Sequence, residues 1–468
     1  MIPTLPEEKA VSPVANTGWL KMFQPDPPAA VMLTDPEEIK ARYRFWQKRI
    51  LISTIVGYAL FYFVRKNLSM AMPAMEKDLG ISKSDLGLFL TLHGLLYGVS
   101  KFANGFWGDR CNARVFMVTG LILSAAMNVC FGLSSAAIAL GIFWMLNGWV
   151  QGMGFPPCAR LMTHWFSPKV FATKFAVWNT SHSIGAFATV VLCGYIVAPD
   201  GILIPENWRL CFFVTAAIAV CGAIFLRTSL RDTPPSLGLP EVEGTGTTKR
   251  ETARIDWTFL REQVFSNRYI WFVSLANFFV YTIRYAVLDW GPTLLSETKG
   301  IKLNHAGWMV AAFEISGLVG MLLCGWLTDK VFGGRGSRTA LFSMIFAGTS
   351  VFLFWKLPNQ SALLSTGLLC CAGFFIYGPQ ALTGIIVAKL ATKHAAATAV
   401  GLTGIFGYAS TILSGWGLGL LVEKRGWDMG FAGMIGCAAL GAAMFALAWP
   451  AKAHGYKEEE IEGKKTGK

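Results

Sequence analysis

Charged residues are scarce in this chain. They make up 15% of its 468 residues, whereas hydrophobic residues make up 53%. A soluble protein of this length would divide into several domains with many more charges on their surfaces. Here the apolar residues form repeated runs of about 20, the length that a helix needs to cross a bilayer. The composition therefore excludes a soluble globular protein and predicts an all-α, multi-pass membrane protein.

Motifs of catalysis and of metal binding are also missing. The ten cysteines lie mostly inside the apolar runs without metal-ligand spacing, and the adjacent Cys370 and Cys371 suit neither a zinc site nor a disulfide framework. No nucleophile–base constellation, phosphate loop or metal cluster stands out, so we expect neither an enzyme nor a cofactor. The first residues, up to about position 45, contain no apolar segment behind a basic cap, so we expect no cleavable signal peptide.

Twelve apolar runs lie between charged or Gly/Pro breaks, and we interpret each as a membrane-spanning helix. They cover residues 50–73, 85–107, 115–135, 137–163, 172–197, 208–227, 269–293, 305–328, 339–356, 361–388, 395–421 and 429–449. The third and fourth spans are the least clearly separated, because Ser134-Ser135 is the whole connector between them.

Basic residues indicate the orientation of these spans. With the N-terminus in the cytoplasm, 29 of the 41 lysines and arginines fall on the cytoplasmic side, 8 outside and 4 within spans. Cytoplasmic loops of membrane proteins carry such an excess, so both termini are predicted to be cytoplasmic. The same asymmetry accounts for the formal net charge of +13 without a nucleic-acid partner.

The chain divides into two six-helix halves. A polar stretch rich in proline, glycine and threonine separates them, and we expect it to be a cytoplasmic linker. The predicted organisation is a cytoplasmic tail (1–48), an N-terminal six-helix bundle (49–228), the linker (229–268), a C-terminal six-helix bundle (269–450) and a second cytoplasmic tail (451–468).

The two halves carry the same landmarks at a nearly constant offset. The repeated pairs, 219 or 220 residues apart, are Gly105 and Gly325, Asp109 and Asp329, Trp208 and Trp427, and Arg65 and Arg284. Parallel six-helix repeats are a transporter architecture, so we predict two pseudo-symmetric bundles around a central site.

Two of these landmarks are arginines deep inside apolar spans, where an ionised group is costly and usually faces a partner, a cavity or a substrate. Arg65 shares one helical stripe with Tyr58 and Tyr62, and Arg284 follows Tyr281 and Asn277 at the same spacing. Both stripes can therefore face one cavity. For either arginine alone, snorkelling to a headgroup and pairing with an internal carboxylate remain alternatives.

Two guanidinium groups that converge from opposite walls suit a doubly charged phosphoryl group, since each can donate two parallel hydrogen bonds to its oxygens. In an empty site, two unit charges about 4 Å apart would repel by roughly 4 kcal/mol at an effective dielectric constant near 20. We therefore expect closure around the site to need a bound anion, which makes the protein an exchanger instead of a leak.

Several motifs resemble one family of membrane transporters. The Gly-x-x-x-Asp-Arg/Lys signature after the second and eighth spans resembles the major facilitator superfamily. More specifically, its organophosphate:phosphate antiporters are similar to YFVRKN (62–67), GVSKF (98–102), QGMGFPPC (151–158) and RYAVLDWG (284–291). YGPQ (377–380) and KHAA (393–396) look most like bacterial hexose-phosphate transporters and the membrane sensors related to them. The likeness covers nearly the whole chain outside the tails.

The resemblance implies that Arg65 and Arg284 bind phosphate from the two halves, supported by Lys101 and His182. On residue chemistry alone, Lys101 could instead snorkel, and His182 could be a buried structural hydrogen-bonding residue. Other residues that could line the cavity are Tyr58, Tyr62, Tyr281, Tyr408, Phe155, Asn179 and Gln380, with interhelical packing as the alternative for the tyrosines. Residues 406–414 carry no charge, unlike some hexose-phosphate carriers of this family, so the sugar-recognising residues stay unranked.

Other charges in the spans have a different implied role. The resemblance implies that Lys66, Asp289 and Glu314 form an interdomain ion-pair network that is made and broken during transport; mutual neutralisation is a compatible alternative. At helix ends, the pairs expected to latch cytoplasmic loops are Asp109 with Arg114 and Asp329 with Arg338.

Together these patterns predict a secondary transporter of the bacterial inner membrane. It would exchange a phosphorylated sugar, first of all glucose 6-phosphate, for inorganic phosphate by rocking of its halves. The alternatives are a transporter-like sensor of external hexose phosphate that acts through a partner kinase, and a carrier for glycerol 3-phosphate. A proton-coupled symporter of neutral sugars would need a titratable carboxylate at the site. Two facing arginines disfavour such a symporter. We expect a monomer whose partners are the lipid bilayer, an organophosphate and inorganic phosphate.

Overall fold

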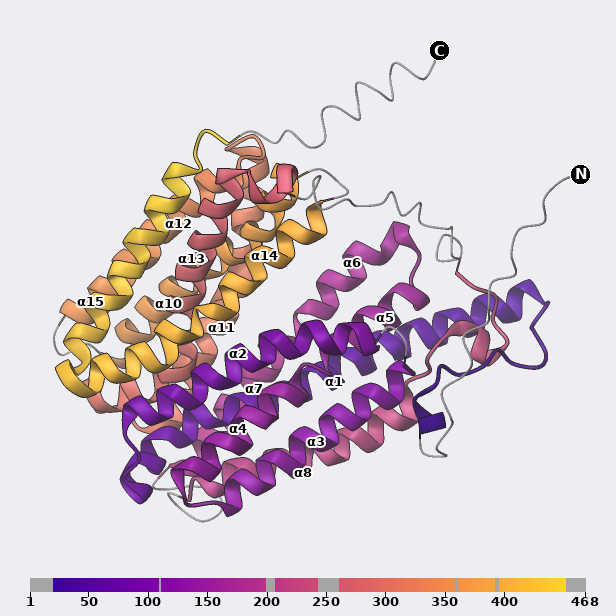
Figure 1. The fold of residues 1–468 in the computed structure, drawn as a ribbon, viewed down its shortest axis with the longest axis horizontal. Helices are drawn as coiled ribbons and strands as arrows, with labels where there is room; N and C mark the ends of the chain where they lie inside the picture. The colour runs from indigo at the N-terminus through magenta and orange to yellow at the C-terminus, as the bar shows by residue number, and fades with distance from the viewer. Residues whose placement is uncertain are drawn as a thin grey trace, which may run out of the picture.

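The computed structural model describes residues 20–108, 111–198, 207–242, 261–357, 361–391 and 395–451, and the elements in these ranges are all helical (Figure 1). In chain order, the α-helices are α1 (Pro36–Leu79), α2 (Lys83–Gly108), α3 (Ala113–Leu133), α4 (Ala137–Gln151), α5 (Phe155–Trp165), α6 (Pro168–Asn179), α7 (Ser181–Val197), α8 (Arg209–Ser229), α10 (Arg268–Lys299), α11 (Leu303–Lys330), α12 (Gly336–Lys356), α13 (Ala362–Leu390), α14 (Ala396–Ala409) and α15 (Leu418–Leu447). The short segments are η1 (Leu20–Phe23), η2 (Pro234–Leu237), η3 (Arg261–Phe265) and η4 (Ile412–Gly417).

Ten helical stretches in the described ranges are long and apolar enough to cross a membrane. Nine of them correspond to the second to tenth predicted spans, and the tenth, Thr398–Leu447, contains the eleventh and twelfth. The backbone of that last stretch breaks at Gly426, where φ is 77°. Helix α1, which holds the first predicted span, is not among the ten, because its charged residues lower its mean hydropathy. As expected, α3 and α4 end and begin on either side of Ser134-Ser135.

The two arginine-bearing helices begin and end in the same way. Asp35 caps α1 by accepting a hydrogen bond from the Glu37 amide, and Asn267 caps α10 by accepting one from the Tyr269 amide. Both helices end at a glycine in the left-handed conformation, Gly80 with φ 64° and Gly300 with φ 63°. These two glycines are 220 residues apart, the offset of the other repeated landmarks.

The helices form two groups that meet at an angle (Figure 1). Helices α1 to α8 make up the first group, and α10 to α15 make up the second. We call the end at which α1 starts and α15 finishes the tail end, and the opposite end, with the α1–α2 and α10–α11 connections, the far end. The groups approach each other where α15 meets α2, at the far end, and stand apart where α6 and α14 lie.

Close backbone approach holds the groups together at the far end. A Cβ atom on Gly307 in α11 would lie 2.6 Å from the carbonyl oxygen of Val190 in α7. A Cβ atom on Gly87 in α2 would lie 2.4 Å from the carbonyl oxygen of Gly415 in η4. Only glycine permits such approach, which is a common device where helices pack in membranes.

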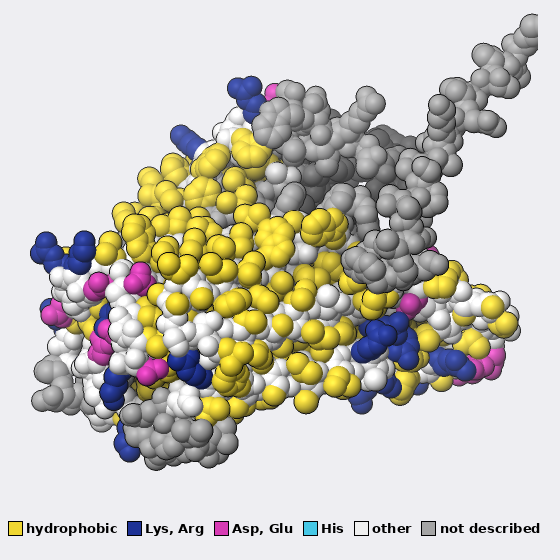
Figure 2. Space-filling view, turned by 60° about the horizontal axis from the view of Figure 1, so that its bottom comes forward, with side chains coloured by type: hydrophobic (Ala, Val, Ile, Leu, Met, Phe, Trp, Pro, Cys, Tyr) yellow, Lys and Arg dark blue, Asp and Glu magenta, His cyan; other side chains and the backbone are white. Residues whose placement is uncertain are grey.

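Apolar side chains cover the flanks of the molecule. Figure 2 shows a broad hydrophobic surface, with the basic and acidic side chains gathered mainly toward its two ends. Large apolar residues such as Ile138, Leu322 and Leu363 are 80%, 72% and 84% exposed. A surface of this kind is suited to lipid, which supports the assignment as a multi-pass membrane protein.

The described part of the linker is packed against the first group. The amides of Ala29 and Leu33, which precede α1, donate to the carbonyls of Pro235 and Gly238 at 2.8 and 2.7 Å. Leu239 is fully buried. The start of the linker and the segment before α1 therefore brace each other; residues 243–260 lie outside the described ranges.

Candidate anion-binding site

A cavity of about 270 Å³ lies between the two groups, and helices of both contribute to its wall. It brings together all eleven residues predicted for phosphate binding and for its support: Tyr58, Tyr62, Arg65, Lys101, Phe155, Asn179, His182, Tyr281, Arg284, Gln380 and Tyr408. Six further residues complete the wall: Tyr97, Tyr285, Leu318, Met321, Tyr377 and Ala381. The arginine stripes of α1 and α10 thus share one cavity.

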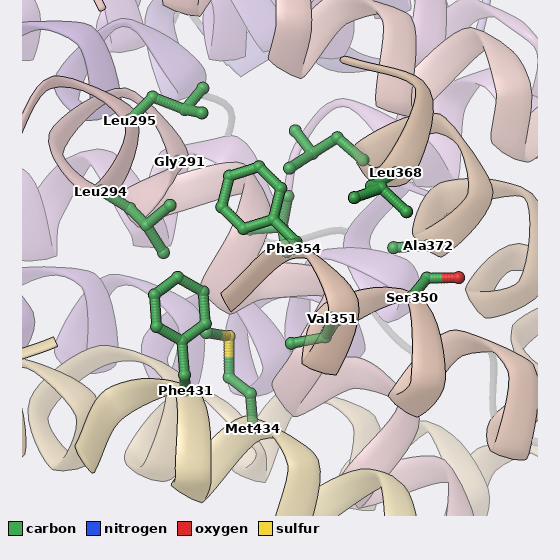
Figure 3. Close-up of a pocket in the computed structure, with 12 residues that line it drawn as sticks. Gly291, Leu294, Leu295, Ser350, Val351, Phe354, Leu368, Ala372, Phe431 and Met434 are labelled. Carbon is green, nitrogen blue, oxygen red and sulfur yellow. The ribbon is translucent and has the colours of Figure 1, made fainter. Parts of the chain in front are cut away.

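Another cavity has a very different lining. It has a volume of about 30 Å³, lies within the second group and is surrounded by apolar side chains such as Phe354, Phe431 and Met434, with the hydroxyl of Ser350 nearby (Figure 3). An ionised ligand has no counter-charge there, and a void of this size holds about one water molecule. It is a packing defect of the second group and not a candidate site.

Arg65 faces aromatic rings. Its guanidinium carbon lies 4.1 Å from the ring centroid of Tyr97 and 5.3 Å from that of Tyr62. Cation–π contact of this kind stabilises a desolvated charge without neutralising it. No carboxylate of the described residues lies within ion-pair distance of Arg65, so its charge is available to an anion.

Arg284 is held by a carboxylate. Its Nη2 atom lies 3.4 Å from Oε1 of Glu314, and its guanidinium carbon lies 4.5 Å from the ring centroid of Tyr377. The Tyr377 hydroxyl donates a short hydrogen bond to the same Glu314 oxygen. Arg284 is 6% exposed and Glu314 is 1% exposed, so the pair is deeply buried. Pairing with an internal carboxylate, an alternative that the sequence left open, is the arrangement seen for Arg284.

This arrangement corrects the prediction for Glu314, which was expected to join an interdomain network. It pairs instead with Arg284 inside the second group. The other two members, Lys66 and Asp289, do pair between the groups, with their Nζ and Oδ1 atoms 2.5 Å apart. Both side chains are largely buried, so this pair ties α1 to α10 next to the cavity.

Lys101 and His182 also face the cavity. Lys101 lies 4.1 Å from the ring centroid of Phe155, and its Nζ atom donates to the Tyr408 hydroxyl of the other group at 3.3 Å. The His182 Nδ1 atom lies 3.0 Å from the Ser183 hydroxyl, and its ring lies 6.0 Å from that of Tyr62. Lys101 therefore points inward, and it does not snorkel to the tail end.

Several buried polar atoms at the cavity have no hydrogen-bond partner. They include Nε of Arg284, Oε2 of Glu314 and Oε1 of Gln380; the amide nitrogen of Gln380 donates to the Tyr281 hydroxyl at 3.4 Å. Unpaired buried polar groups are uncommon and call for a ligand or ordered water. The cavity region therefore has hydrogen-bonding capacity that a ligand or ordered water could use.

Only one of the two predicted loop latches, Asp329 with Arg338, lies within the described residues. Asp109 lies outside the described residues, and Arg114 pairs with Asp26, before α1, at 3.4 Å. Arg338 lies over the ring of Trp449 at 4.6 Å, and none of the ion pairs among the described residues joins it to Asp329. A buried ion pair at the tail end links Arg160 with Asp232 at 3.2 Å, and no pattern in the sequence predicted it.

Three tyrosines of the cavity were also missed: Tyr97, Tyr285 and Tyr377. Each had a signal in the sequence. Tyr97 lies one helical turn before Lys101, Tyr285 is next to Arg284, and Tyr377 opens the YGPQ motif. Helical spacing from a candidate residue would have found Tyr97 and Tyr377.

Comparison with known proteins identifies the family of the chain. The model of the Major Facilitator Superfamily matches residues 54–415. The chain belongs to the major facilitator superfamily. A "probable hexose phosphate transport protein" of Chlamydia pneumoniae is 37% identical, over 92% of this chain and 97% of that protein. The "membrane sensor protein UhpC" of Escherichia coli K12 is 38% identical, over 91% of this chain and 97% of that protein.

Solved structures agree on the fold. A bacterial homologue of the human lysosomal transporter Spinster, in an inward-facing and unoccupied conformation, superposes with a TM-score of 0.72 over 86% of this chain and 97% of that one, at 16% identity. The resemblance to hexose-phosphate transporters and their sensor relatives is therefore confirmed, and the chain is a multi-pass protein of the bacterial inner membrane. Its family and relatives indicate membrane transport as the activity, and not catalysis.

Proposed function

We propose that this protein is a secondary transporter that exchanges a phosphorylated sugar, first of all glucose 6-phosphate, for inorganic phosphate. The observation that carries the proposal is the convergence of Arg65 and Arg284, from different helix groups, on one cavity with unpaired polar atoms. Guanidinium groups recognise phosphate oxygens through paired hydrogen bonds. The relative named as a hexose phosphate transport protein supports the same class of substrate.

The charge balance of the site suits a dianion. Four cationic side chains lie at or beside the cavity, namely Arg65, Lys66, Lys101 and Arg284, and two carboxylates, Asp289 and Glu314, accompany them. These six groups leave a surplus of two positive charges. A phosphate monoester carries about −1.5 to −2 at neutral pH, so one bound substrate would balance the surplus.

This balance refines the expected coupling between binding and closure. The empty site does not hold two free facing arginines, because Glu314 already neutralises Arg284. The uncompensated charges are those of Arg65 and Lys101. Their desolvation in an occluded cavity would oppose closure until an anion is bound. Obligatory exchange is therefore still expected, but it depends on Arg65 and Lys101 and not on the two arginines.

The proposed topology has twelve spans in two pseudo-symmetric bundles, 49–228 and 269–450, joined by the cytoplasmic linker 229–268 and flanked by cytoplasmic tails 1–48 and 451–468. The basic residues favour a cytoplasmic tail end. The far end would then face outward, and its packing would make this conformation one that is closed to the outside.

Alternating access would proceed by rocking of the two groups around the cavity. Opening to the outside requires the far-end contacts to separate. These include the ion pair between Lys83 of the first group and Glu297 of the second, 3.1 Å apart, and the hydrogen bond from the Ser84 amide to Glu423 at 2.8 Å. Such a set of polar contacts can re-form in each cycle without a hydrophobic penalty.

A sensor function is the second candidate, since a relative 38% identical to this chain is named a membrane sensor. Purified protein in proteoliposomes separates the two functions. We expect preloaded phosphate to exchange for external glucose 6-phosphate, tested beside glycerol 3-phosphate and inorganic phosphate. Binding without any flux would favour the sensor. Phosphate efflux that is equally fast without external substrate would refute the coupling.

A further inference from the structure

Helix α1 is broken immediately before Arg65. Val64 has φ −94° and ψ 17°, outside the helical region, although the helix continues on both sides from Pro36 to Leu79. A break of this kind leaves backbone carbonyls to be satisfied by other groups, which is obligatory in a membrane interior that lacks water.

Side-chain amides of two other helices satisfy these carbonyls. The Val64 oxygen accepts from Nδ2 of Asn128 at 2.9 Å and from Nδ2 of Asn147 at 2.8 Å. The Phe61 oxygen accepts from Nε2 of Gln151 at 3.1 Å. We call Asn128, Asn147 and Gln151, which come from α3 and α4 and are 2% exposed or less, the amide collar.

The collar also fixes the chain beyond Arg65. Asn67 donates to Oδ1 of Asn128 at 2.7 Å and to the hydroxyl of Thr215 in α8 at 3.0 Å. The chain is thus held through backbone carbonyls four residues before Arg65 and directly before it, and through the Asn67 side chain two residues after it. A side chain between such anchors has its direction set by the backbone.

Arg284 is positioned in a different way. Helix α10 has no non-helical residue around Arg284, whose guanidinium is held by Glu314. Arg65 has no carboxylate partner among the described residues, so the direction of its side chain depends on the backbone and on the rings of Tyr62 and Tyr97. The amide collar orients Arg65 through the backbone, whereas Glu314 orients Arg284 by direct contact with its guanidinium.

We propose that the amide collar positions Arg65: Asn128, Asn147 and Gln151 keep α1 broken at Val64 and so aim the guanidinium into the cavity without adding negative charge. A carboxylate in this role would neutralise the arginine, whereas an amide orients it and leaves its charge free. In its link to phosphate binding, the inference rests on the proposed function.

The test compares Asn147→Ala and Asn128→Ala with the unmodified protein. Each variant leaves the other amide donating to the Val64 carbonyl, so folding is expected to persist. Asn112→Ala is the matched control. Asn112 is equally buried and caps α3 through the Val115 amide, but it touches neither α1 nor the cavity.

The first readout needs no ligand. Modification of arginines by phenylglyoxal is followed by peptide mass spectrometry, with Arg284 as internal reference. The collar variants should change the rate at Arg65 by about threefold or more, and Asn112→Ala should not. Equal rates at Arg65 in all proteins would overturn the inference.

The second readout is the Kd for inorganic phosphate, measured by calorimetry. A displaced bidentate arginine should weaken binding about tenfold in the collar variants, while Asn112→Ala lowers thermal stability without changing the Kd. Changed Arg65 reactivity with unchanged phosphate affinity would uphold the positioning and count against phosphate binding by Arg65. Wild-type protein that binds no phosphate would refute the proposed function and would leave the positioning of Arg65 by the collar standing.

Discussion

Glu314→Gln is the substitution that tests the charge balance of the cavity most directly. It keeps the size and hydrogen-bonding capacity of the side chain but removes the charge that now faces Arg284. At 3.4 Å and an effective dielectric constant near 20, the attraction between these unit charges is about 5 kcal/mol. The variant therefore leaves Arg284 uncompensated and raises the surplus at the site from two positive charges to three.

Anion binding should become tighter as a result. A phosphate on Arg284 would lie roughly 6 Å from the carboxylate, where each unit of negative charge is repelled by about 3 kcal/mol at the same dielectric constant. The variant removes this repulsion, but part of the resulting gain in binding free energy is lost to desolvation of the anion. We therefore expect at least a tenfold lower Kd for phosphate, which corresponds to about 1.4 kcal/mol. Release should slow correspondingly, and turnover in counterflow should fall.

Calorimetry on the purified protein and counterflow in proteoliposomes measure the two effects. Asp78→Asn serves as the control. Asp78 is also a carboxylate near an arginine, 4.0 Å from Arg209, but lies outside the cavity. Phosphate affinity that is unchanged or weaker in Glu314→Gln, with Asp78→Asn unaltered, would show that Glu314 does not compete with the anion for Arg284.

Three further results are expected. Lys66→Gln should lower the free energy of unfolding by about 3–5 kcal/mol, because it leaves the buried Asp289 carboxylate uncompensated. In a melting experiment, the double variant with Asp289→Asn should recover most of this loss. Equal melting temperatures of the single and double variants would contradict the prediction. Gly307→Leu should prevent closure of the far end, so that phosphate still binds but counterflow falls to background; normal exchange would show that this helix contact need not re-form. Arg65→Lys should weaken phosphate binding by roughly 10–100-fold and by more than Arg284→Lys does, as measured by calorimetry.

The sequence predicted which residues meet at the cavity better than it predicted how they pair. Helical spacing and the repeat placed Arg65 and Arg284 on facing stripes, because a helix face follows from the sequence alone. The sequence did not predict the partner of Glu314, because the rotation of α11 against α10 is set by the packing of all the helices of the second group. Glu314 was therefore grouped with Lys66 and Asp289 in an interdomain network, although Arg284 is its partner in the structure.

The tail end shows the same limit. Asp26 was an unremarkable residue of a polar tail, and nothing in its neighbourhood predicted that it would pair with Arg114. The buried pair of Arg160 and Asp232 joins the end of one span to the start of the linker across 72 residues. Such contacts depend on how the linker folds back, for which neither periodicity nor charge counting gives a signal. The break at Val64 was equally hidden, because no proline or glycine marks it.

The difference expected between the two arginine variants follows from what holds each guanidinium. Arg284 shares its charge with Glu314, and a lysine there could keep that ion pair and still offer a charge to the cavity. Arg65 is surrounded by rings and backed by neutral amides, so its hydrogen bonds to an anion are not shared with a carboxylate. Replacing it by lysine removes planar, paired hydrogen bonds to the anion, each worth about 1.5–3 kcal/mol when charged. Equal losses at the two positions would mean that Glu314 moves away from Arg284 before the anion binds, so that both arginines are equally free.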